Sequence, residues 1–176
     1  MTTETPIKPY RSAGDPARAY SLAEPDGQPA RWWLGGHLAV KARGADTDGR
    51  FCQIEFSDPC GNAPPVHIHH WEDETFYVLE GLVTVIIGHS RIEASQGEFV
   101  FMPRDVPHSY LVRSERARAL VTYAPAGIEQ FFIEMGLPVT DPDQPPPPVV
   151  PDHDLFAREM GRYGVELVGP PPTLER

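Results

Sequence analysis

The chain has few cysteines, no cluster of basic residues and no long apolar run, and each shortage excludes a class of protein. Cys52 and Cys60 are its two cysteines in 176 residues, too few for a disulfide framework, so we expect free thiols. A formal net charge of -10 disfavours nucleic acid and anionic membranes as partners. No segment approaches the roughly 18 apolar residues that span a bilayer. Residues 1–15 lack the apolar core of a signal peptide, so we expect a cytoplasmic protein.

Helical periodicity is also scarce over most of the chain. From Arg31 to about Ala124, short β-branched and aromatic runs alternate with clusters of Gly, Pro, Asn, Asp and Ser. This pattern is typical of an all-β sandwich or barrel of antiparallel strands. Residues 1–30 are polar and rich in Pro and Ala, and we expect an extended arm there. The sequence thus predicts an arm over 1–30, a barrel over 31–126 and a tail over 127–176.

The tail contains the two predicted helices. Residues 127–136 place Ile128, Phe131, Phe132 and Met135 on one helical face, and Gly136 followed by Pro138 predicts the end of that helix. Four consecutive prolines within 141–151 favour a semi-rigid extended segment. The run "DHDLFAREMGRYG" predicts a second helix capped by Asp152 or Asp154, and "VELVG" predicts a last strand.

Three histidines and a glutamate have the spacing of a metal site. His67 and His69 are two residues apart, so on a strand both side chains share one face, opposite to that of His70. Glu74 opens the next strand, and His108 begins a later one. Three imidazoles and one carboxylate suit one divalent transition metal ion, whether Mn, Fe, Co, Ni, Cu or Zn. We interpret the neighbouring acids, Glu72 and Asp73, as solvated loop charges.

A His-x-His pair alone is a weak signal, but the wider spacing is specific. The chain reads Gly61-x5-His67-x-His69-x4-Glu74-x6-Gly81 and then Gly97-x5-Pro103-x4-His108. This pattern resembles the two-part motif of the cupin superfamily. It departs from the motif at Asp105 and Val112, where the family has Gly and Asn, and neither departure removes a ligand. The resemblance implies a double-stranded β-helix, or jelly-roll barrel, with C-terminal helices here and the metal inside one end.

Within that superfamily the chain resembles the single-domain bacterial quercetin 2,3-dioxygenase-like (quercetinase-like) cupins. The resemblance rests on "HWEDETFYVLEG", on "GEFVFMPRDVPHSY" and on the order of elements in the tail. It implies a dioxygenase that uses O2 on a flavonol-like or other enolisable aromatic or polyketide substrate, with Glu74 as catalytic base. Strand parity with the ligands predicts a pocket lined by Phe76, Val78, Tyr110 and Val112. Either Phe99 and Phe101 or Val100 and Met102 should also face inward.

Other functions and placements stay open at this level. A cupin of this kind can also be a metal-dependent cyclase, isomerase or dehydratase of secondary metabolism, or a ligand-binding protein without turnover. The 127–136 helix either covers the metal end of the barrel or packs on its outer sheet. We expect a homodimer, because the run "WWL" at 32–34 needs cover.

Overall fold

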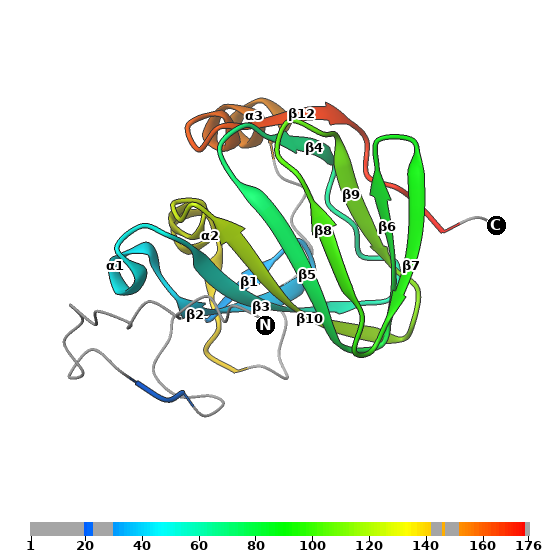
Figure 1. The fold of residues 1–176 in the computed structure, drawn as a ribbon, viewed down its shortest axis with the longest axis horizontal. Coiled ribbons are helices and arrows are strands. Elements are labelled where there is room, and N and C mark those ends of the chain that lie inside the picture. The colour runs from blue at the N-terminus through cyan, green and yellow to red at the C-terminus, as the bar shows by residue number, and fades with distance from the viewer. Residues whose placement is uncertain (1–19, 23–29, 142–145, 147–151, 175–176) are drawn as a thin grey trace, which may run out of the picture.

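The protein is a barrel of two facing antiparallel sheets (Figure 1). The computed structural model describes residues 20–22, 30–141, 146 and 152–174. The larger sheet holds, in spatial order, β11 (Leu137–Pro138), β1 (Ala30–Trp33), β2 (Gly36–Ala42), β3 (Cys52–Pro59), β10 (Arg116–Ala124), β5 (Asp73–Glu80) and β8 (Phe99–Met102). The smaller sheet holds β12 (Val165–Gly169), β4 (Val66–His69), β9 (His108–Val112), β6 (Leu82–Ile87) and β7 (Ser90–Ser95). The prediction of an all-β jelly roll with C-terminal helices is confirmed.

Alternation along the strands places the core between the two sheets. On β5 the side chains of Glu74, Phe76 and Val78 are buried, as strand parity requires. On β8, Val100 and Met102 face inward and are buried, whereas Phe99 and Phe101 face outward and are 61% and 53% exposed. This decides between the two pairs that the sequence left open. The interior of the barrel is therefore filled largely by side chains.

The tail is built into both sheets. β11 pairs with β1, and β12 pairs with β4, where Leu167 lies opposite His67 and Val165 lies opposite His69. The helices of the tail are α2 (Glu129–Met135) and α3 (His153–Gly161), and α3 lies beside β12 at one end of the barrel (Figure 1). The Asp152 side chain caps α3 by accepting hydrogen bonds from two backbone amides, as predicted.

The helices of the tail also cover Trp33, the central residue of the run "WWL". The ring of Trp33 lies 5.1 Å from that of Phe131, 5.3 Å from that of Phe132 and 5.8 Å from that of Phe156, centroid to centroid. Phe131 is fully buried, and the predicted apolar face of α2 thus joins the core. No helix among the described residues is long and apolar enough to span a bilayer.

Two local features shape the start of the barrel. β1 and β2 form a hairpin, and the two residues between them, Leu34 and Gly35, both adopt positive φ, at 47° and 88°. The turn after β2 contains a short helix, α1 (Gly44–Thr47). The predicted arm (residues 1–30) and the proline-rich segment at 141–151 lie mostly outside the described residues. The predicted division of the chain at residues 30 and 126 stays a prediction.

Candidate metal centre

The four predicted ligands converge inside the barrel. His67 and His69 come from β4, Glu74 from β5 and His108 from β9, where His108 pairs directly with His67 across the two strands. One ligand atom from each of the four lies within 4.8 Å of every other. All four side chains are buried. Strand parity thus brings together groups that are up to 41 residues apart in the chain.

Each imidazole is oriented by the partner of its Nδ1 atom. Nδ1 of His67 lies 2.8 Å from the Pro65 carbonyl oxygen, and Nδ1 of His108 lies 2.9 Å from that of Val106. A carbonyl oxygen only accepts, so in both residues Nδ1 carries the proton and donates it. Nε2 of each ring is then the atom directed at the centre. Three nitrogen atoms and one carboxylate oxygen are a donor set that fits a divalent transition metal ion.

The electrostatics of His67 and Glu74 favour the forms that bind a cation, whereas at His108 burial acts to lower the pKa but the contact with Glu74 raises it overall. Burial, reinforced by neighbouring His108 and His69, lowers the pKa of His67 to about 3, so this imidazole is neutral at physiological pH. Burial acts to raise the pKa of Glu74, but the contacts with the imidazoles, His108 above all, lower it overall. The Oε2 atom of Glu74 lies 3.1 Å from Nε2 of His108 and 3.4 Å from Nε2 of His69.

The acids beside Glu74 include one that the sequence interpretation placed wrongly. Glu72 is not a solvated loop charge, because its side chain is buried and its Oε2 atom lies 3.3 Å from Nδ1 of His69. Asp73 does remain at the surface, where it pairs with Arg104 at 2.8 Å. Both acids sit next to a turn, where strand parity is undefined, so no signal in the sequence separates them.

His70 points away from the centre, as strand alternation predicts. Its exposed ring lies 2.7 Å from Oδ1 of Asp105 and 3.2 Å from Oε2 of Glu166. Asp105 itself has a φ of 61°, and so it fills the turn position where the cupin motif has Gly.

A small cavity of about 40 Å³ adjoins the ligands. Tyr110 is the one residue of the predicted pocket that lines it. Phe76 and Val112 line a second cavity of about 10 Å³, which Tyr110 also lines. Val78 is fully buried and lines neither cavity. Strand parity identified the inward faces, but it missed the aromatic and apolar side chains that close the cavity beside the predicted ligands. They come from β1 and the turn after it, from β3 and β10, and from the tail: Trp33, Leu34, Phe56, Tyr123, Ile128, Phe132, Phe156 and Met160.

A buried acid stands behind Tyr110. The Tyr110 hydroxyl donates to Oδ2 of Asp58 at 2.6 Å, and a Cβ at Gly36 would lie 1.8 Å from Oδ1 of the same carboxyl group. Burial raises the pKa of Asp58 to about 6, although hydrogen bonds from Tyr110 and Asn62 act in the opposite direction.

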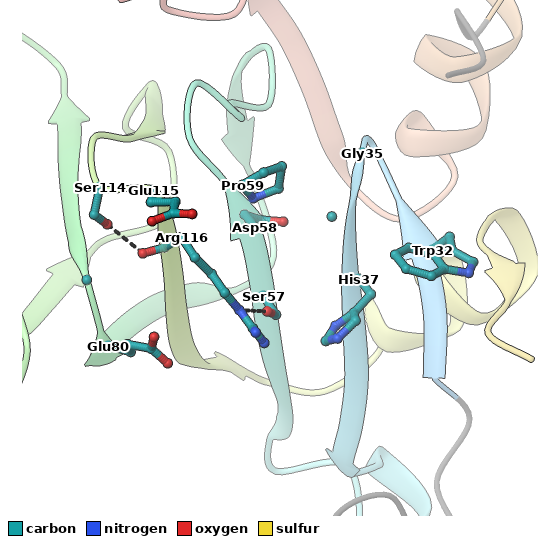
Figure 2. A pocket seen from close by; sticks show the side chains of 12 residues that line it. Trp32, Gly35, His37, Ser57, Asp58, Pro59, Glu80, Ser114, Glu115 and Arg116 are labelled. Carbon is teal, nitrogen blue, oxygen red and sulfur yellow. Dashed lines mark hydrogen bonds between the residues drawn. The ribbon is translucent and has the colours of Figure 1, made fainter. Parts of the chain in front are cut away.

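Asp58 also reaches a much larger groove of about 750 Å³ that contains none of the four predicted ligands (Figure 2). Trp32 and His37 stand on one side of this groove, and Glu80, Glu115 and Arg116 on the other (Figure 2). The Arg116 side chain donates to the Ser57 hydroxyl at 2.8 Å. The size of this groove alone does not make it the reactive site, since the four predicted metal ligands lie elsewhere.

Comparison with known proteins agrees with the fold and the ligand spacing. Residues 55–123 match the family model of the cupin domain. The chain is 32% identical over 102 residues to the quercetin 2,3-dioxygenase of Bacillus subtilis, covering 58% of this chain and 30% of that enzyme. It is 30% identical over 56 residues to an uncharacterised protein of Streptomyces coelicolor, covering 32% of this chain and 53% of that protein. The chain thus spans about a third and about half of these two relatives.

Solved structures share the fold at low sequence identity. An RmlC-like cupin from Shewanella frigidimarina is 16% identical with a TM-score of 0.53, over 64% of this chain and 96% of that one. An oxalate decarboxylase variant from Bacillus subtilis is 19% identical with a TM-score of 0.52, over 57% of this chain and 28% of that one. With the converging side chains and the barrel, these matches show that residues 55–123 form a cupin domain, and that this barrel is similar in sequence to a quercetin 2,3-dioxygenase.

Proposed function

We propose that this protein is a metal-dependent dioxygenase that acts on a flavonol-like or other enolisable aromatic or polyketide substrate. The observation that carries the proposal is the buried set of three imidazoles and one carboxylate beside a cavity with aromatic walls. The similarity to a quercetin 2,3-dioxygenase supports the same reaction class. His67, His69, His108 and Glu74 would hold one divalent metal ion. When bound, that ion would supply a Lewis acid for the enolate oxygen and a centre for reaction with O2.

The residues of the chain have separable tasks in this proposal. Glu74 is the catalytic base: its lowered pKa keeps it ionised at neutral pH, the form that accepts the hydroxyl proton of the substrate. Tyr110, Tyr123 and Phe132 provide flat apolar walls for a planar ring. The side chains of α2 and α3 exclude water, which strengthens every electrostatic interaction at the centre.

The cavity beside the predicted ligands is too small for a flavonol as it stands. Pockets for drug-sized ligands measure roughly 300–1,000 Å³, whereas this cavity measures about 40 Å³. A flavonol therefore enters only if Phe132, Phe156 and Met160 move away from the centre. Because these side chains belong to α2 and α3, we propose that the two helices open for substrate and close over it.

A non-oxidative reaction is the second candidate. Tyr110 lines the cavity, and its hydroxyl donates a hydrogen bond to the buried Asp58 carboxyl group. Acid–base chemistry without O2 would use this pair together with Glu74. Cyclisation, isomerisation and dehydration are the reactions that such a site would perform.

The test is turnover of a polyphenol panel by purified protein of known metal content, in air and under anaerobic conditions. Oxygen consumption that matches substrate loss, and that ceases in Glu74→Gln, supports the dioxygenase. Equal turnover without oxygen supports the second candidate instead. Binding without any turnover would leave a ligand-binding cupin. The matched control is His70→Ala, which changes an exposed histidine next to the ligands and should retain activity.

A further inference from the structure

We propose that Glu72 is a positioning residue for the metal centre: its carboxylate fixes the ring of His69 so that Nε2 of that ring is presented to the ion. This inference rests on the metal centre of the proposed function. It assigns a role to a side chain that the spacing of the cupin motif does not include. The role follows from how the three imidazoles are held.

The three imidazoles differ in what holds Nδ1. His67 and His108 each use the backbone carbonyl oxygen of the residue two positions earlier, Pro65 and Val106. These acceptors are part of the strand entry and are independent of side-chain identity. His69 instead faces the Oε2 atom of Glu72 at 3.3 Å, three residues later. Its orientation therefore depends on one particular side chain.

Burial of the Glu72 carboxyl group is unfavourable unless a polar or charged partner lies beside it. The residue is 1% exposed, and removing a carboxylate from water without compensation is strongly unfavourable. His69 lies between two such groups, with Oε2 of Glu72 3.3 Å from its Nδ1 and Oε2 of Glu74 3.4 Å from its Nε2.

A carboxylate on Nδ1 has two effects on a ligating imidazole. It accepts the Nδ1 proton, which leaves the lone pair on Nε2, and it increases the basicity of that nitrogen. Loss of such an outer partner typically lowers metal affinity about 10- to 100-fold. We expect a loss of that size when Glu72 can no longer accept a hydrogen bond.

The experiment compares Glu72→Leu, which removes the acceptor, with Glu72→Gln, which keeps the volume and an amide oxygen that still accepts. Co²⁺ is the probe, because its visible absorption reports the coordination sphere and competition with a chelator gives its affinity. We expect about a 10- to 100-fold loss of affinity and an altered Co²⁺ spectrum in Glu72→Leu. In Glu72→Gln we expect a loss of less than about 10-fold and a spectrum close to that of the wild type. Glu98→Gln, which changes an exposed carboxylate, is the matched control.

The outcomes separate this inference from the proposed function. If the wild type binds no Co²⁺, the metal centre itself is wrong. If the wild type binds it but Glu72→Leu binds it equally well with an unchanged spectrum, the positioning role is wrong and the centre stands. Equal losses in the Leu and Gln variants would also overturn the role, because the acceptor would then not be the cause. If circular dichroism shows Glu72→Leu to be unfolded, Glu72→Met replaces it in the same comparison.

Discussion

At the scale of single residues, the direction in which a side chain points matters as much as the residue type. His69 and His70 are adjacent in the sequence, yet one ring faces the buried centre and the other is 42% exposed between two carboxylates. Glu72 and Asp73 are adjacent too, and one is buried against His69 while the other pairs with Arg104 at the surface. The chemistry of a residue in this region therefore depends on which side of the strand or turn it occupies.

The first prediction concerns metal content. We expect one metal ion per chain in the wild type, and a large loss of occupancy in His67→Ala, His69→Ala and His108→Ala, because each change removes one of four ligand atoms. His70→Ala should keep the wild-type content. Elemental analysis of the purified proteins measures this directly. An empty His70→Ala protein beside a full His69→Ala protein would show that the strand faces are assigned the wrong way round.

The second prediction concerns Asp58 and pH. Its folded-state pKa of about 6 is above the unfolded value, so protonation of Asp58 stabilises the fold at low pH, and this contribution is lost as the pH rises through about 6. A shift of about two pKa units corresponds to roughly 2–3 kcal/mol. Asp58→Asn stays neutral and can still accept from Tyr110. The stability of Asp58→Asn relative to the wild type should therefore be higher at pH 7.5 than at pH 4, by about 2 kcal/mol in the free energy of unfolding.

Urea unfolding of both proteins at the two pH values measures this difference. A gap between variant and wild type that is the same at pH 4 and pH 7.5 would show that Asp58 has no raised pKa in the folded protein.

At the scale of elements, α2 has two roles that cannot be separated by deletion. Ile128 and Phe132 line the metal cavity, while Phe131 is fully buried in the core beside Trp33. A truncation after Ala126 would thus remove cavity wall and core together, and we expect it to aggregate whether or not the helix covers the site. Substitutions on α3 are the more informative change.

The third prediction therefore uses α3. Phe156→Ala removes a ring that lines the cavity and stacks on Trp33, and we expect the free energy of unfolding to fall by about 3 kcal/mol. Metal content should not change, because α3 carries none of the four ligands. Since the ring blocks the space above the ligands, we expect a flavonol to bind faster to this variant. Stopped-flow fluorescence and urea unfolding measure the two effects.

Leu155→Ala is the control for that experiment, because Leu155 lies on the same helix and is 41% exposed. It should change neither the binding rate nor the stability by more than about 0.5 kcal/mol. An unchanged binding rate in Phe156→Ala would mean that substrate enters without displacement of α3.

At the scale of the whole molecule, the fourth prediction is a homodimer. The argument from "WWL" has weakened, because Trp33 packs against Phe131, Phe132 and Phe156 of its own chain. We still expect a homodimer, and light scattering at micromolar concentration measures its mass. A mass of 19.6 kDa, that of one chain, would contradict the prediction.

The sequence by itself determined the barrel and the four residues of the predicted metal centre. Strands have a period of two, so His67, His69 and Glu74 could be assigned to inward faces from spacing alone. Gly61, Gly81 and Gly97 marked sharp turns, and all three adopt positive φ. These features are local, which is why a linear pattern reveals them.

Only the tertiary structure decided what surrounds those ligands. Glu72 lies in a turn without a period, and its burial depends on where His69 points. Trp33, Phe132 and Phe156 come from three elements far apart in the chain, and they meet because β11 and β12 add the tail to both sheets. Contacts of this kind depend on packing between distant segments, and no short-range pattern in the sequence encodes them.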